Sequence, residues 1–309
     1  MLNLEKLTKD QEKEWDVFVD THSEGLFEHK MPFIKFLQNN GKAPRNFLIK
    51  DKKIMGLISL TKEKKAFFTR YASQGLLISQ KENKNKIIDL IKQITKDANY
   101  LRINNIKNAI RDKTTPITFI LNCKDLELKE IFDKKLESRA RRAIKKAIKN
   151  KLQIKISNSE KELEEFYKIY TKKMKEYGTI PYSLESLKEL IKNKEYKIFN
   201  IYHENKIIAG GTMIVYKKRI TNHLAASNKE FLKFSPNNFL YYSMIKFAKE
   251  NDLETINYGP SLESDRVAKF KISMGGMPSP IEEHIVINNF SYKLFKLASF
   301  IILKLKKVI

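Results

Sequence analysis

The residues best suited to chemistry form a short string near the end of the chain, Lys269-Phe270-Lys271, followed by the pair Gly275-Gly276. A β-type run ends at Tyr258 and is broken by Gly259-Pro260, so we expect a polar loop to present the string at a strand end. Ammonium groups close to backbone in such a loop suit an anionic or reactive substrate at the edge of a sheet. A cation placed at a developing oxyanion in a dry cleft also acts selectively on the transition state.

Most of the other candidate groups have two interpretations, one functional and one structural. Tyr258 and Tyr182 either hydrogen-bond a substrate or pack. Asp265 and Glu263 are either general bases or solvated loop carboxylates, and His223 reads as a strand residue with a satisfied ring. No Ser-His-Asp or Cys-His set is visible, and the five histidines are never in metal-ligand spacing.

The bulk composition indicates a folded chain with a polyanionic partner. A hydrophobic content of 42% supports a sizeable core, and a length of 309 residues favours two domains. Lysine and arginine total 60 against 36 acidic residues, which leaves a net charge of +24. Such a charge indicates nucleic acid, anionic lipid or a phosphorylated substrate, although a general bias toward Lys, Ile and Asn is the alternative.

The remaining global features favour a cytoplasmic location. Cys123 is the only cysteine, which excludes an intramolecular disulfide and fits a reducing compartment. The N-terminus lacks the apolar core of a signal peptide, and no apolar run approaches the roughly 20 residues that span a bilayer.

Two stretches half a chain apart resemble each other. Each has an amphipathic helix, predicted near residues 12–19 and 160–177, followed by a β-hairpin, predicted at residues 46–58 and 198–210. Helices and hairpins in the same order indicate two copies of one α/β unit.

A basic segment lies between the two copies. Residues 134–151 have apolar positions at helical spacing and one acid, Glu137, so they predict a helix with one apolar stripe and a basic face. This helix is either a solvated connector or a surface for phosphates of tRNA or lipid headgroups, in which case Arg142 and Lys146 bind substrate.

Two later segments complete the plan. Ser235 is the expected N-cap of a helix that has Pro236 at its first position. Residues 226–239 contain no glycine, so the Gly-rich pyrophosphate loop of acyl-CoA enzymes is absent and a standard acyl-CoA site is disfavoured. The tail, residues 288–309, predicts an amphipathic helix that either packs on the first domain or lies in a membrane interface.

Several motifs between residues 138 and 276 together resemble the FemAB-type aminoacyl and acyl transferases, which have a GNAT-like fold. They are Arg141-Arg142, Tyr177-Gly178-Thr179, Ala209-Gly210-Gly211, Ala225-Ala226-Ser227, Ser235-Pro236-Asn237 and Phe270-Lys271 with Gly275. The N-terminal half resembles the family only loosely, through Trp15 and residues 27–37. The resemblance implies transfer of an amino acid from aminoacyl-tRNA to the peptide of a cell-wall precursor, or a related peptidyl or acyl transfer.

The resemblance also implies roles for single residues. Phe270 and Lys271 match the pair at the reaction centre, where the lysine stabilises charge that develops as an amine attacks the ester carbonyl. Lys175 and Tyr177 lie where the family binds its acceptor, although the arginine often found there is absent. The other residues assigned to substrate binding are Tyr182, Tyr258, Ser235, Asn237, Arg142 and Lys146.

We therefore predict an α/β chain of two tandem GNAT-like domains, residues 1–133 and 152–287, joined by the basic helix 134–151. The predicted activity is amide formation on a peptidoglycan or related cell-envelope precursor, with aminoacyl-tRNA as donor and a phosphorylated or lipid-linked acceptor. We expect no cofactor and no metal, and we expect Lys271 in a cleft between the domains. The alternatives are an N-acyltransferase that uses acyl-CoA or acyl carrier protein, and a non-catalytic module that binds RNA or membrane.

Overall fold

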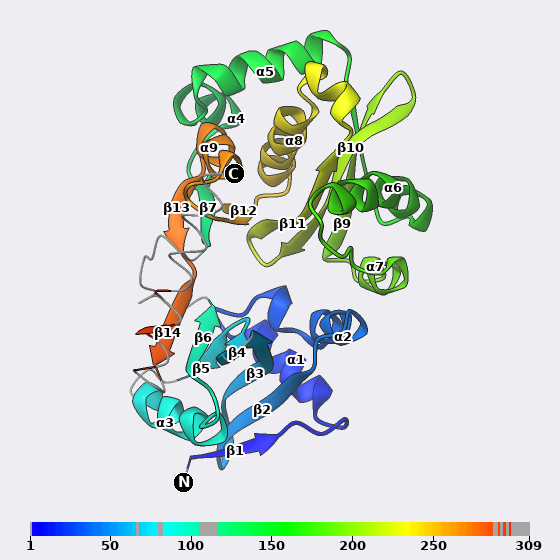
Figure 1. Ribbon diagram of the computed structural model, residues 1–309. Helices are drawn as coiled ribbons and strands as arrows, with labels where there is room; N and C mark the ends of the chain where they lie inside the picture. The colour runs from blue at the N-terminus through cyan, green and yellow to red at the C-terminus, as the bar shows by residue number, and fades with distance from the viewer. Residues whose placement is uncertain are drawn as a thin grey trace. The chain divides into compact units, whose positions relative to one another are not determined.

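The computed structural model describes residues 2–65, 68–79, 83–104 and 116–286, with positions 290, 293, 294 and 297 of the tail. The chain forms two compact units, one of Met1–Pro116 with Pro280–Ile309 and one of Ile117–Ser279. Each unit is a mixed sheet with helices (Figure 1). The tail helix predicted at residues 288–309 lies almost entirely outside the described residues.

The first unit has one sheet, in the order β1-β2-β3-β4-β6-β14, with β5 paired to β3. Its strands are β1 (Asn3–Lys6), β2 (Pro44–Asp51), β3 (Lys53–Lys65), β4 (Phe68–Ser73), β5 (Leu76–Ile78), β6 (Tyr100–Asn104) and β14 (Glu282–Val286). Its helices are α1 (Glu12–Thr21), η1 (Phe27–His29), α2 (Met31–Asn39) and α3 (Lys84–Ile94). Strands β4 and β6 run parallel, and the other neighbouring strands of the described sheet pair antiparallel.

The second unit has the sheet order β13-β7-β12-β11-β10-β9-β8. Its strands are β7 (Ile117–Asn122), β8 (Gln153–Ser157), β9 (Tyr196–His203), β10 (Lys206–Tyr216), β11 (Arg219–Ser227), β12 (Thr255–Ser261) and β13 (Met277–Pro280). Its helices are α4 (Leu128–Glu130), η3 (Ile131–Lys135), α5 (Ser138–Lys149), α6 (Glu160–Glu176), α7 (Leu184–Ile191), η4 (Lys229–Phe234), α8 (Pro236–Glu250) and α9 (Arg266–Ser273).

The two units share one plan, so the predicted duplication is confirmed. In each, a first strand and two helices precede an antiparallel meander, and a helix then leads to a strand parallel to the last meander strand. The predicted domain boundaries need correction, because each sheet receives one strand from the part of the chain that was assigned to the other domain. Strand β7, from before residue 133, pairs with β12 in the second sheet, whereas β14, from before residue 287, pairs with β6 in the first.

The basic helix is shorter than predicted and belongs to the second unit. Helix η3 ends at Lys135, residues 136 and 137 are extended, and α5 begins at Ser138. The helix buries Ala140, Ile144 and Ala147 in a core that it shares with α8. It is therefore a packed part of the second unit rather than a connector between domains.

The two glycines of the Ala209-Gly210-Gly211 motif lie in β10, where both faces of the sheet are closely covered. Successive strand residues point to opposite faces of a sheet. A Cβ on Gly210 would lie 2.9 Å from the ring of Phe166 on α6, and a Cβ on Gly211 would lie 3.5 Å from the side chain of Leu240 on α8. Helix α6 thus covers one face and α8 the other, and the missing side chains let both approach closely.

Within the described part of the chain, no helix is both long enough and apolar enough to cross a bilayer.

Candidate active site

The second sheet opens into a fork between β11 and β12. The two strands pair in parallel only from Arg219 to Thr221, opposite Thr255 to Asn257. Beyond this point β12 bulges against β7 and passes through Gly259, which has a positive φ of 77°. A Cβ on Gly259 would lie 3.1 Å from the backbone oxygen of Asn222, so the two strands stay close where their pairing ends. Strand β12 therefore continues to Ser261, instead of being broken at Gly259-Pro260 as predicted.

Lys271 lies at this fork with its side chain buried. The residue is 4% exposed, and Nζ donates to Gly259 O at 2.9 Å, Pro260 O at 3.0 Å and Ser261 Oγ at 2.8 Å. Nζ also lies 5.6 Å from the ring centre of Phe119, a cation–π contact. The three donors of an ammonium group are thus matched by three acceptors. The predicted proximity of Lys271 to the strand end is confirmed, although the group is enclosed by protein atoms rather than projecting outward.

Burial lowers the pKa of Lys271 to about 8, and the charge of Asp265 partly opposes this shift. Desolvation disfavours a charged amine, so the pKa falls. The ammonium form still dominates at pH 7. The fork therefore contains a positive charge in a dry environment, and no carboxylate among the described residues forms an ion pair with it.

The segment that carries Lys271 is a helix, which corrects the predicted loop. Helix α9 begins after Asp265 and ends in a Schellman motif, in which Gly276 N donates to Lys271 O at 3.0 Å and Gly275 N donates to Ile272 O at 2.8 Å. Gly275 has a positive φ of 84°, which suits glycine. The glycine pair therefore ends the helix one turn after Lys271 and fixes its position against the sheet.

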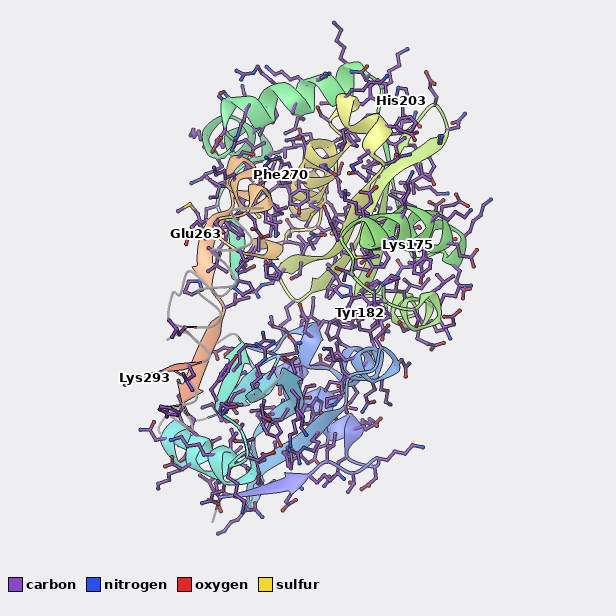
Figure 2. All side chains as sticks on the ribbon, viewed as in Figure 1. Lys175, Tyr182, His203, Glu263, Phe270 and Lys293 are labelled. Carbon is purple, nitrogen blue, oxygen red and sulfur yellow. The ribbon has the colours of Figure 1, made fainter. Side chains whose placement is uncertain are left out.

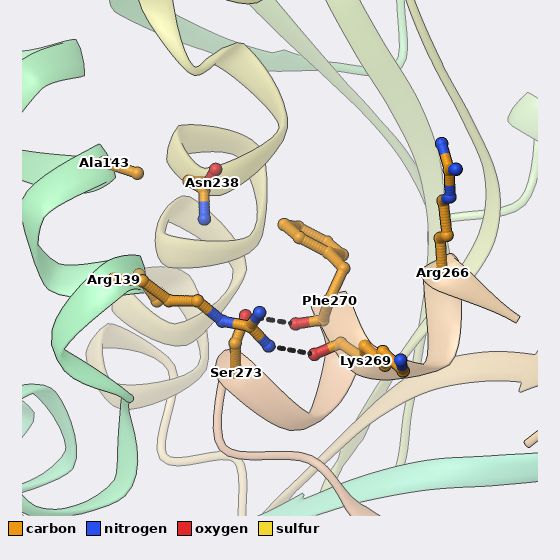
Figure 3. A pocket seen from close by; sticks show the side chains of 8 residues that line it. Arg139, Ala143, Asn238, Arg266, Lys269, Phe270 and Ser273 are labelled. Carbon is orange, nitrogen blue, oxygen red and sulfur yellow. Dashed lines mark hydrogen bonds between the residues drawn. The ribbon is translucent and has the colours of Figure 1, made fainter. Parts of the chain in front are cut away.

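Phe270 lies beside a basic pocket (Figure 3). The pocket has a volume of about 340 Å³ and lies among α5, the start of α8 and α9. Its lining residues are Arg139, Ala140, Ala143, Asn238, Arg266, Lys269, Phe270 and Ser273. Three of these described residues are cationic and none is acidic, so the pocket suits an anion beside an aromatic ring.

The cations of α5 divide into two groups. Arg139 pairs with Glu137 at 2.8 Å and donates to Lys269 O at 2.9 Å, and Arg141 donates to the backbone oxygens of Asp133 and Leu136. These two arginines hold neighbouring segments together. Those on the exposed side are Arg142, Lys145, Lys146 and Lys149, and none of them has an acidic partner within the described ranges.

The predicted acceptor residues Lys175 and Tyr177 are not brought to the fork. Both are exposed at the end of α6, and Figure 2 shows Lys175 well separated from Phe270. Tyr177 is 63% exposed and is covered on one side by Lys173, whose Nζ lies 4.7 Å from its ring centre. Their role in binding an acceptor stays a prediction.

The other predicted residues have mixed positions. Tyr258 is fully buried, and its hydroxyl donates to Met274 O at 2.9 Å, so this side chain packs. Ser235 precedes α8 as predicted, but it has a left-handed φ of 61° and its side chain makes no capping bond. Asn237 does not line the pocket, whereas its neighbour Asn238 does.

Several polar residues at the fork were not predicted as site residues. On one face, Asn222 Nδ2 lies 3.2 Å from Tyr241 Oη, and Asn222 Oδ1 is buried without a partner in the described structure. On the other face, Tyr196 Oη lies 2.5 Å from His223 Nδ1. The available signal was the polar sequence Thr221-Asn222-His223 inside an otherwise apolar strand. No group of three or more metal-binding side chains occurs in the described residues.

The family comparison fits this geometry. Residues 134–271, a little under half of the chain, match the acetyltransferase (GNAT) domain family. The predicted transferase class is thereby confirmed, and no sequence among the curated proteins matches the chain.

Solved structures extend the likeness over nearly the whole chain. FemX is 16% identical with a TM-score of 0.69, over 94% of this chain and 99% of its own. The C-terminal domain of a putative lysylphosphatidylglycerol synthetase from Agrobacterium fabrum is 12% identical with a TM-score of 0.65, over 95% and 96%. A tandem GNAT protein from the clavulanic acid biosynthesis pathway is 7% identical with a TM-score of 0.56, over 93% and 99%. These likenesses concern the fold, and they confirm the FemAB-type resemblance and the two tandem GNAT-like domains.

Proposed function

We propose that the protein transfers an amino acid from aminoacyl-tRNA to an amine of a cell-envelope component, such as a peptidoglycan precursor. The observation that carries this proposal is the buried Lys271 ammonium at the fork, on the same helix that contributes Arg266, Lys269 and Phe270 to the basic pocket. In the reaction, the amine nitrogen attacks the ester carbonyl and the bond to the ribose oxygen breaks. A fixed positive charge in a dry site favours the anionic intermediate over the neutral ester.

The tRNA donor is supported by charge. The pocket contributes Arg266 and Lys269, and α5 adds exposed cations such as Arg142 and Lys146. Together with a net charge of +24, these groups suit a polyanion whose end reaches the fork. The names of two structural neighbours, FemX and lysylphosphatidylglycerol synthetase, agree with aminoacyl transfer to envelope components.

A second candidate is an N-acyltransferase that uses acyl-CoA, because the family match is to acetyltransferases. Such enzymes hold pyrophosphate on a Gly-rich turn before a helix. The corresponding segment here is η4 and Ser235, which contains no glycine and places Ser235 in a left-handed conformation. This departure favours the tRNA donor.

The test is a transfer assay with two donors and two acceptors. Bulk tRNA charged with radiolabelled amino acids, or radiolabelled acetyl-CoA, is offered with a precursor peptide that has a free lysine amine, or with phosphatidylglycerol vesicles. We expect label from tRNA on the peptide. Arg266→Gln with Lys269→Gln should raise KM for tRNA, whereas the control Lys194→Gln, on the α7–β9 turn, should not. Transfer from acetyl-CoA alone would establish the second candidate and refute the first.

A further inference from the structure

We propose that the first unit contains a second ligand site, a cavity that binds the phosphate ester of a small polar molecule such as a sugar or a nucleoside. The cavity has a volume of about 520 Å³ and lies among β1, α1, α2 and the start of β2 (Figure 1). All of its lining residues belong to the first unit, whereas Lys271 belongs to the second. The site is therefore independent of the proposed transfer reaction.

The corresponding corner of the second unit is closed by one side chain. Asn158, on the linker from β8 to α6, donates from Nδ2 to Ile191 O at 3.2 Å and to Tyr196 O. These oxygens lie at the end of α7 and at the start of β9. Its Oδ1 accepts from Lys197 Nζ at 2.9 Å. Asn158 thus ties the linker, the helix end and the strand start together.

The same corner of the first unit is open. The linker from β1 to α1 is longer there, residues 7–11, and its side-chain hydrogen bond is internal, from Thr8 N to Gln11 Oε1 at 3.1 Å. The linker is joined to β2 through the backbone, since Leu7 N donates to Asn46 O at 2.9 Å. The duplicated plan therefore provides a reference within the chain, in which a corner that is tied in one copy is hollow in the other.

Arg45 on β2 has the place that Lys197 has on β9, since each is the second residue of its strand. Its Nη2 donates to Tyr71 Oη at 2.7 Å, and the guanidinium lies 5.1 Å from the centre of the Tyr71 ring. Tyr71 is 2% exposed, and its hydroxyl donates to Asp97 Oδ1 at 3.2 Å. The guanidinium is therefore held in position by an aromatic hydroxyl, and its other N–H groups remain for a ligand.

The charges around the cavity suit an anion. Arg45, Lys6 and Lys9 line it, and none of the three forms an ion pair with another described residue. The lining carboxylate is that of Glu12, whose Oε2 accepts from Lys35 Nζ at 2.5 Å, so its charge is already matched. Arginine binds phosphate through paired N–H groups, and lysine binds it as a point charge. The three cations thus favour a phosphate group over a neutral ligand.

The rest of the wall indicates the class of the ligand. Gln38 and Asn46 supply amide groups, and Leu7, Met31 and Pro44 add apolar surface. Small-molecule sites have volumes of roughly 300–1,000 Å³ and combine apolar walls with a few polar groups. A free phosphate ion would leave most of this cavity unfilled. A phosphate ester fills it, with the phosphate at the cations and the hydroxyl groups of its body at the amides.

The test is isothermal titration calorimetry of the full chain, without tRNA or acceptor. The probes are ribose 5-phosphate, adenosine 5′-phosphate, inorganic phosphate and uncharged adenosine. We expect saturable binding of at least one ester, about tenfold tighter or more than that of inorganic phosphate or adenosine. Arg45→Gln with Lys9→Gln should weaken this binding by about a hundredfold, since each hydrogen bond to a charged group typically accounts for about tenfold or more.

Two further double variants make the result specific. Lys6→Gln with Lys9→Gln leaves Arg45 in place and changes exposed side chains, so the expected loss of affinity cannot come from a disturbed fold. Lys13→Gln with Lys53→Gln is the matched control. It removes the same charge from exposed positions of the first unit that do not line the cavity, and it should bind the ester as the wild type does.

Three results would overturn the proposal. They are the absence of saturable binding of either ester, an equal affinity for inorganic phosphate, and a loss of affinity in Arg266→Gln with Lys269→Gln instead of in the Arg45 variant. The last result would place the ester in the basic pocket of the second unit. Because the titration involves no group transfer, a failed transfer assay would leave its outcome unchanged.

Discussion

Replacement of Lys271 by methionine tests the central residue of the site. Methionine keeps an unbranched chain of similar length and removes the charge and the three hydrogen bonds to residues 259–261. Loss of one preorganised charge from a site of this kind costs on the order of 3–4 kcal/mol of transition-state stabilisation, or about a hundred- to a thousandfold in rate. The first expectation is therefore a folded protein with a strongly reduced kcat.

The lowered pKa of Lys271 adds a second expectation, for stability against pH. The folded pKa is about 8 and the ordinary value is 10.5, so the unfolded chain binds more protons between these values. Stability rises with pH wherever the unfolded state binds more protons. From pH 7 to pH 9.5 the free energy of unfolding of the wild type should rise by about 2 kcal/mol relative to Lys271→Met. The same titration should make wild-type kcat fall as pH rises through about 8.

Urea unfolding at the two pH values and initial transfer rates from pH 6 to 9.5 measure both effects. Lys194→Met is the control, because Lys194 is exposed on the turn between α7 and β9 and does not line the basic pocket. A parallel pH dependence of stability in wild type and Lys271→Met would show that Lys271 has no lowered pKa. Wild-type transfer rates in Lys271→Met would remove it from the catalytic mechanism.

Two further predictions follow from the same elements. Gly275→Ala should destabilise the protein by more than about 1 kcal/mol in urea unfolding, because its φ of 84° is strained for alanine and a Cβ would lie 3.3 Å from Lys135. The control Gly178→Ala, with a φ of 62° and nothing within 4 Å, should cost only the strain, and equal losses would contradict the packing argument. Replacement of Arg142, Lys146 and Lys149 by Gln should weaken tRNA binding and reduce the slope of log affinity against log salt by about two to three. An unchanged slope would make the exposed side of α5 a solvated surface.

The elements that could be predicted from the sequence are those with a clear local pattern of apolar residues. The hairpins β2–β3 and β9–β10 and the helices α1 and α6 followed from apolar spacing and polar turns. The exchange of β7 and β14 was not predictable in this way. Strand β7 reads Ile-Thr-Phe-Ile-Leu-Asn, an apolar run that suits any buried position, and nothing local decides which sheet receives it.

Helix α9 was missed because its pattern is inverted. Val267 and Ile272 are 48% and 38% exposed, whereas Lys271 and Ser273 are buried. Apolar periodicity read from the sequence therefore points to the wrong face, and the segment looked like a loop. Polar residues such as His223 were not predicted as site residues for a related reason. A β-bulge changes the face of the sheet on which a strand residue lies, and no residue type in the sequence indicates where a bulge occurs.

The inverted pattern of α9 is itself evidence about function. The same unit contains another buried charge, Glu162, which is 5% exposed, pairs with Lys155 at 2.5 Å and accepts hydrogen bonds from Asn200 and Tyr202. Its pKa is lowered because these partners outweigh the burial, as expected for a structural ion pair. Lys271 has only backbone and hydroxyl acceptors, and its pKa moves against the charged form. Burial of the Lys271 cation costs stability, and helix α9 exposes an isoleucine while it buries this lysine. Both features depart from the usual pattern of buried apolar side chains and paired buried charges. Such departures concentrate at functional sites. The fork between β11 and β12 is where this chain shows one.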